Sequence, residues 1–130
     1  MKTGTLMKKE SSKPKKQRKW HYGKPLHILQ KDFSVHLSKD LRKDLKRRSL
    51  EARTGDTVKI VRGDKKYSGK QGKITALVRN KRQVLIEGIV RKKVDGTEKQ
   101  VPFRASNLLL VAIEEKDNKR MKNRKKAGAK

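Results

Sequence analysis

Positively charged side chains crowd a glycine-rich stretch in the middle of the chain. They are Lys59, Arg62, Lys65, Lys66, Lys70, Lys73, Arg79, Lys81 and Arg82. Lysine binds a phosphate as a point charge, and arginine binds it as a two-pronged donor. Exposed backbone N–H groups at Gly63, Gly69 and Gly72 could add further donors. The stretch therefore predicts a binding surface for structured RNA, which is recognised largely through shape, phosphates and 2′-hydroxyls.

Further candidate RNA ligands lie on both sides of this stretch. Trp20, His21 and Tyr22 stand in a basic N-terminal arm that we expect to become ordered on RNA, since aromatic faces beside cations suit unpaired bases and phosphates. Arg47 and Arg48 directly precede the central region, and residues 91–93 form a later basic triplet. That triplet is Arg91, Lys92 and Lys93. We expect all of these side chains to contact RNA.

The overall charge favours the same partner. Lys and Arg total 39 against 13 acidic residues, which gives a net charge of +26. Such an excess repels itself in a compact state and indicates that the protein works beside a polyanion. The alternative is a surface that lysines merely keep soluble. Aromatic residues make up only 4% of the chain, which is too few for a sheet that stacks bases on its aromatic side chains.

Catalytic and metal-binding patterns are missing from the sequence. There is no cysteine, which excludes disulfides and cysteine-based zinc sites. His21, His27 and His36 have no carboxylate at metal-ligand spacing. No paired carboxylates or activated nucleophile can be proposed, and apolar content is too low for a deep pocket. We therefore expect a binding protein, not an enzyme, with no metal, cofactor or small-molecule substrate.

Three short motifs of other protein classes match the sequence only superficially. Gly63 to Lys70 resembles a nucleotide-binding glycine loop, but its glycines have one intervening residue too many, and Gln71 stands where Ser or Thr should hold magnesium. Gly69 to Gly72 spells the GXXG of a KH domain, yet it joins apparent strands instead of helices. Residues 62–64 spell Arg-Gly-Asp by coincidence. No stretch approaches the ~20 apolar residues of a membrane span, and no secretory signal is visible.

Five short strands are predicted to carry the cationic stretch. They cover residues 58–61, 74–78, 83–90, 99–103 and 107–113. β-branched residues dominate the first two, and the loop between them holds Gly63, Gly69 and Gly72. We expect Gly69 and Gly72 to supply the backbone freedom that the turn needs. Asp95-Gly96 favours a tight turn with positive φ at both central residues. The last strand is apolar enough to be buried on both faces, and Pro102 marks an edge or a strand end. Strands at this spacing predict a mostly β fold, a small five-stranded barrel.

A helix and two basic extensions flank the predicted barrel. Residues 37–48 predict a short helix with Ser38 as N-cap and Leu37, Leu41 and Leu45 on one face. Residues 1–25 lack apolar anchors, so we expect them to be disordered in the free protein. The resulting division is a basic N-terminal extension over 1–36, the helix within 37–50, the barrel over 51–113 and a basic tail over 114–130. Met121 is the one possible anchor of a helical turn in that tail, and its final basic cluster also fits a nuclear-import signal.

The central stretch also resembles a known family. Val58 to Val78 resembles the KOW motif, a strand-loop-strand unit of ribosomal proteins and transcription elongation factors. Gly55-Asp56-Thr57-Val58 before it and Val84-Leu85-Ile86-Glu87-Gly88-Ile89 after it resemble the KOW proteins of the large ribosomal subunit. Arg47-Arg48-Ser49 and the basic extension resemble their archaeal and eukaryotic form. The resemblance covers roughly residues 30–115.

This resemblance carries expectations of its own. It implies an SH3-like barrel in a structural component of the cytoplasmic ribosome. It also implies contact with the 5′ domain of the large ribosomal RNA, binding early in subunit assembly, and neighbouring ribosomal proteins near the polypeptide exit tunnel. Two alternatives stay open, a KOW-bearing transcription elongation factor and a free-standing RNA chaperone. A structural component would stay with the large subunit through a high-salt wash, whereas a factor would dissociate.

Overall fold

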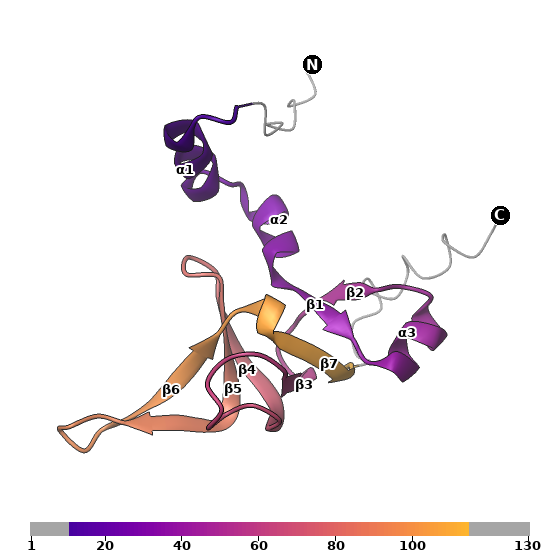
Figure 1. The fold of residues 1–130 in the computed structure, drawn as a ribbon, viewed down its shortest axis with the longest axis vertical. Coiled ribbons are helices and arrows are strands. Elements are labelled where there is room, and N and C mark those ends of the chain that lie inside the picture. Colours follow the sequence, from indigo (N-terminus) through magenta and orange to yellow (C-terminus); the bar gives the residue numbers. More distant parts are fainter. Residues whose placement is uncertain (1–10, 115–130) are drawn as a thin grey trace.

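The computed structural model describes residues 11–114 of the chain (Figure 1). Its elements follow in the order α1 (Pro14–Tyr22), α2 (Leu26–Leu29), the 3-10 helix η1 (Gln30–Phe33), β1 (Ser34–Leu37), α3 (Lys39–Leu45), β2 (Ser49–Glu51), β3 (Thr57–Ile60), β4 (Gln71–Val78), β5 (Gln83–Lys92), β6 (Glu98–Phe103), the 3-10 helix η2 (Ala105–Asn107) and β7 (Leu108–Ala112). Of the predicted C-terminal tail over 114–130, only residue 114 is described, and Met121 lies outside the described residues.

The strands form one bent, mostly antiparallel sheet, so the prediction of a small, mostly β fold is confirmed. The described part of the chain contains seven strands in the order β2-β1-β7-β3-β4-β5-β6. β1 and β7 are the parallel pair, joined at His36↔Leu109 and Leu37↔Leu110. The five predicted strands correspond to β3, β4, β5, β6 and β7. β1 and β2 were not predicted. Both are short, and β1 pairs with β2 and with β7, which is distant in the sequence.

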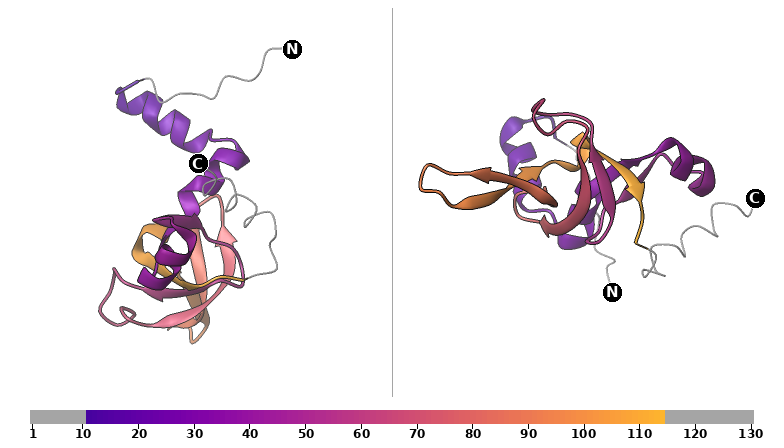
Figure 2. Two further views of the ribbon diagram at one scale, coloured as in Figure 1. Left: turned by 90° about the vertical axis from the view of Figure 1, so that its right-hand side faces the viewer. Right: turned by 90° about the horizontal axis from the view of Figure 1, so that it is seen from below.

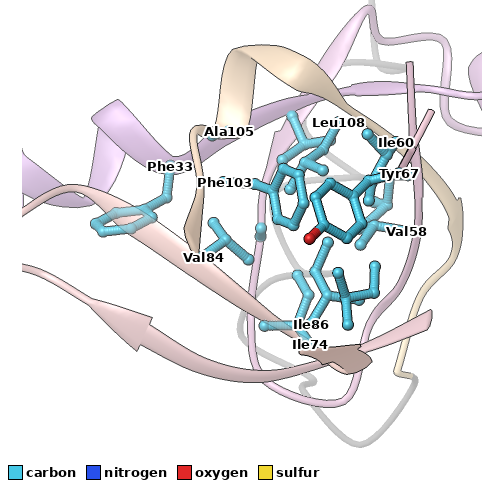
Figure 3. Close-up of a cluster of buried hydrophobic side chains, with 14 of the residues drawn as sticks. Phe33, Val58, Ile60, Tyr67, Ile74, Val84, Ile86, Phe103, Ala105 and Leu108 are labelled. Carbon is cyan, nitrogen blue, oxygen red and sulfur yellow. The ribbon is translucent and has the colours of Figure 1, made fainter. Parts of the chain in front are cut away.

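One apolar cluster fills the inside of the curved sheet (Figure 3). Alternate residues of each strand point into it, as expected for a sheet with one buried face. In β7, Leu108 and Leu110 are buried, whereas Leu109 and Val111 are only partly covered. The prediction that this strand is buried on both faces was therefore wrong, because only its inner face meets the core.

The region before the barrel is more structured than the sequence suggested. Residues 14–33 form α1, α2 and η1, whereas disorder was predicted for residues 1–25 and a basic extension for residues 1–36. Pro14 begins α1, where a missing N–H costs nothing, and good helix formers follow it as far as Lys19. Leu29, Phe33 and Val35 are buried in or beside the core. The core therefore includes residues that the predicted division assigned to the N-terminal extension.

The predicted helix after this region is present as α3. The Ser38 hydroxyl accepts a hydrogen bond from the Leu41 backbone N–H at 3.4 Å, which confirms it as the N-cap. Lys46 ends the helix with a left-handed φ of 49°. Leu41 and Leu45 pack against the core. Leu37 is different: it belongs to β1 and not to the helix face.

A long hairpin of β5 and β6 projects from the barrel (Figures 1 and 2). Of its two turn residues, only Gly96 has a positive φ, 81°, so the predicted two-residue turn was wrong. Gly96 N–H donates to the Lys93 carbonyl and Lys93 N–H donates to the Thr97 carbonyl, at 3.1 and 2.9 Å. This is a three-residue loop that ends on a left-handed glycine. The Thr97 hydroxyl donates to Asp95 and is the main reason that the pKa of this carboxyl is lowered.

Candidate nucleic-acid interface

The loop between β3 and β4 presents a group of exposed cations. Gly63 and Gly69 adopt φ values of 130° and 84°, which side-chain-bearing residues rarely adopt, so their predicted role in the loop is supported. Between and around them stand four exposed basic side chains, Arg62, Lys65, Lys66 and Lys70.

Tyr67 holds this loop against the barrel, which the sequence analysis missed. Its side chain is buried, and its ring lies edge-on to Phe103 with centroids 6.0 Å apart (Figure 3). The Nζ atoms of Lys66 and Lys70 each lie 5.8 Å from the centroid of the Tyr67 ring. A single aromatic residue among glycines and lysines was the available signal. The loop is therefore anchored at its centre while its cations face outward.

Gly72 is not part of the loop but lies within β4, opposite Val58 of β3. Its φ is not in the left-handed region. The reason for glycine is a close approach, since an added Cβ would lie 2.7 Å from Ile86 Cγ2 and 2.8 Å from the Glu87 carbonyl oxygen. The prediction that Gly72 supplies freedom for a turn was wrong. Lys59 and Lys73 flank this contact on β3 and β4, with Lys59 half-buried and Lys73 exposed.

The turn between β4 and β5 divides its three basic residues. Arg79 and Lys81 are exposed. Arg82 instead turns inward, with its side chain only 13% exposed and its Nε 2.9 Å from Asp32 Oδ2. The Nε–H does not point at a hydrogen-bond acceptor, so this contact is an ion pair without a linear hydrogen bond. An internal carboxylate therefore holds Arg82, and its contact with RNA stays a prediction.

Lys24 completes the ion-pair group around Asp32. Its Nζ lies 3.0 Å from both Asp32 oxygens and 4.1 Å from the centroid of the Trp20 ring. Arg82 Nη2 donates to the backbone carbonyl oxygen of His21. We call Trp20, Lys24, Asp32 and Arg82 the junction, because they join the end of α1 to the β4–β5 turn. Trp20 is half-buried here, with Lys24 over its ring, instead of presenting an open face to RNA as expected.

His21 is exposed beside the junction and feels its charges. Its pKa is lowered, first by partial desolvation of the ring and then by the cations of Arg82 and Lys24. The ring lies edge-on to that of Tyr22, with centroids 5.5 Å apart. His21 therefore stays largely neutral near pH 7 and does not add a full positive charge to the surface.

The remaining predicted ligands lie elsewhere on the barrel. Arg47 is half-buried and Arg48 is exposed, between α3 and β2. Arg91, Lys92 and Lys93 are exposed on the projecting hairpin, where they line a shallow groove of about 520 Å³ with Lys99 and Val94. Lys92 Nζ lies 3.8 Å from Glu98. The structure thus spreads the candidate ligands over the β3–β4 loop, the β4–β5 turn, the hairpin and the α3–β2 connection.

Helix α1 and its outer face were not predicted, although its residues were expected to become ordered on RNA. Lys15, Arg18, Lys19 and Tyr22 are all exposed on this helix. Their spacing was visible in the sequence, but the segment was predicted to be disordered and so no face was assigned to it.

Other kinds of site find no support in the described residues. Between residues 11 and 114 there is no group of three His, Asp or Glu side chains that could hold a metal ion. In the same part of the chain no helix has the length and hydropathy needed to cross a bilayer.

Comparisons with known proteins agree on one family. A model of the family described as the ribosomal proteins L26 of eukaryotes and their archaeal counterparts matches residues 11–126. The chain is 40% identical over 116 residues to the large ribosomal subunit protein uL24 of Methanosarcina barkeri, an alignment that covers 89% of this chain and 98% of that protein. It is 37% identical over 124 residues to uL24 of Korarchaeum cryptofilum, with 95% and 93% covered.

Proposed function

The chain belongs to the family of eukaryotic ribosomal proteins L26 and their archaeal counterparts, and we propose that it is a structural, non-enzymatic constituent of the large ribosomal subunit that binds the large ribosomal RNA. It works in the cytoplasm as part of the ribosome. The finer expectations stand as parts of this proposal: contact with the 5′ domain of that RNA, binding early in subunit assembly, and a place beside other ribosomal proteins near the polypeptide exit tunnel.

The observation that carries the proposal is the anchored cationic loop between β3 and β4. Tyr67 fixes the backbone of the loop on the core, so the points from which its exposed cations extend are set before any partner arrives. Holding them in advance lowers the ordering cost of binding. Exposed basic side chains on a fixed loop suit the phosphates of an RNA backbone.

Affinity should come mainly from the release of counterions. Each phosphate that a cation neutralises releases condensed counterions, so the logarithm of the association constant falls linearly with the logarithm of salt concentration. The barrel contributes a rigid frame, and its loops and hairpin carry the charges to separate RNA segments. We expect roughly six to ten phosphate contacts, with a slope of about 0.7–0.9 for each.

A titration of the free protein with a 5′-domain fragment of large-subunit RNA at several salt concentrations tests this account. The linear fall supports it, and a nearly flat response rejects it. Washing large subunits in high salt then separates the proposed structural role from the alternatives. A structural component stays with the subunit, whereas an elongation factor or RNA chaperone appears in the wash.

Order-of-addition reconstitution tests the proposed early role. Omitting the protein from the first step and adding it only after the other large-subunit proteins should give incomplete particles. Particles that form equally well with late addition would reject early assembly but leave RNA binding intact.

A further inference from the structure

Helix α1 carries a face of cations and one aromatic ring that nothing in the described structure covers. Lys15, Arg18, Lys19 and Tyr22 stand at positions i, i+3, i+4 and i+7, so they share one side of the helix. The helix has no buried residue and contains no acidic residue. Tyr22 is 83% exposed, which is unusual for a large aromatic side chain.

A hollow of about 400 Å³ lies beside this face. Its lining consists of Pro14, Gln17, Arg18, Trp20, His21 and Tyr22. Two of the rings are already arranged, since His21 lies edge-on to Tyr22 with an interplanar angle of 81°. Aromatic faces beside an arginine are the combination that binds an unpaired base through stacking and its phosphate through charge.

The junction gives this face a defined position although the helix itself buries nothing. Asp32 receives Lys24 and Arg82 at 3.0 and 2.9 Å, and the three side chains are 25%, 8% and 13% exposed. The Arg82 contact with the His21 carbonyl oxygen reaches the last turn of α1 directly. A helix that touched the barrel through its connecting chain alone would sample many orientations, whereas these contacts restrain its end.

We propose that Arg18 and Tyr22 form a binding site for an unpaired RNA nucleotide, with its base stacked on Tyr22 and a phosphate held by Arg18 and Lys19, and that Asp32 positions this site through the junction. The inference rests on the proposed RNA-binding function and deepens it. The positive charge of the face, together with the absence of any acid on α1, favours RNA over a protein partner. Trp20 packs under Lys24 in the junction, whereas the exposed ring of Tyr22 is the one that stacks on the base.

Binding of the full-length protein to a single-stranded 12-nucleotide oligoadenylate, compared with an RNA duplex of the same length, tests the stacking site. Tyr22→Ala should weaken binding of the single strand roughly 5- to 150-fold, which is the usual stacking contribution of ~1–3 kcal/mol converted at ~1.4 kcal/mol per tenfold. Tyr22→Phe should keep nearly all of the affinity, because the ring remains. Affinity for the duplex, which offers no free base, should change little in either variant.

A double-mutant cycle tests the positioning role of Asp32. Asp32→Asn removes the charge that Lys24 and Arg82 share, and Arg82→Gln is the second variant in case the first destabilises the fold. If the junction positions Tyr22, the effect of Tyr22→Ala should shrink in either background. Trp20, the single tryptophan of the chain, should report release of the Lys24 contact as a change in fluorescence. A role limited to overall stability would leave the Tyr22→Ala effect unchanged.

The outcomes separate this inference from the proposed function. Parental single-strand affinity in Tyr22→Ala overturns the stacking site, and leaves this face for a protein partner. Equal losses for single strand and duplex overturn it as well, since they indicate charge or folding effects. Failure of the parent protein to bind any ribosomal RNA fragment instead rejects the proposed function itself.

Discussion

At the scale of single residues, Gly72 shows how tightly β4 and β5 approach. Gly72→Val should destabilise the barrel by about 1–3 kcal/mol or more, because its Cβ would meet Ile86 and the Glu87 backbone at less than 3 Å. Thermal melts would measure the loss. Gln71→Val, an exposed neighbour on the same strand, is the matched control and should stay within about 0.5 kcal/mol. Equal melting temperatures for the two variants would contradict the close-approach explanation.

The loop lysines should affect binding without affecting folding. Replacing Lys65, Lys66 and Lys70 together with Ala should cost no more than about 0.5 kcal/mol of stability each, because all three are exposed. RNA affinity should fall, and the salt slope should decrease by roughly 2–3 if each lysine meets one phosphate. Titrations with the RNA fragment at several salt concentrations check both.

The control for this variant removes the same charge from another surface. Lys39, Arg42 and Lys43 are exposed on α3 and were not predicted to bind RNA. Their triple replacement with Ala lowers the net charge equally but should change the slope less. If both variants lose the same affinity for RNA, the total charge of the protein governs binding, and the loop is not a preferred contact site.

At the scale of elements, the docking of α1 should depend on pH. The pKa of His21 is lowered from its ordinary value of 6.5 by desolvation and by the cations of Arg82 and Lys24. Because the docked state lowers the pKa of His21, protonation of His21 opposes docking. Docking is therefore strongest above pH 6.5 and weakens as pH falls through the lowered pKa. An NMR titration should therefore find the His21 midpoint below 6.5. Arg82→Gln should raise this midpoint, and an unchanged midpoint would contradict the contact.

Local sequence patterns predicted the elements that depend on local contacts. The strands 58–61, 74–78 and 83–90 and the capped helix after Ser38 were recognisable because alternation and capping are properties of neighbouring residues. β1 escaped prediction because Ser34 and His36 make it look polar, and its partner β7 is distant in sequence. Arg82 looked like any exposed cation for a similar reason. Its partner Asp32 comes from another element, which no spacing rule connects to the turn.

At the scale of the whole molecule, the segment before α3 belongs to the folding unit. A chain shortened to begin at residue 25 should still fold, since it keeps every buried apolar residue. A chain that begins at residue 38 loses Leu29, Phe33, Val35 and Leu37, each worth about 1.5–3 kcal/mol when buried. For a domain of this size that loss is comparable with the total stability. Circular dichroism melts of the two chains would distinguish them, and a stable fold in the shorter chain would place the boundary at α3.

The parallel pairing of β1 with β7 has a consequence for when this protein can fold. β7 lies between β1 and β3 in the sheet, so β1 cannot take its place in the sheet until β7 has been made. Such pairing gives the fold a high contact order, and domains of this kind typically fold in milliseconds to seconds. During its own synthesis the chain therefore cannot complete the sheet until residue 112 is available. The sheet of this protein should therefore be completed only after β7 has been synthesised.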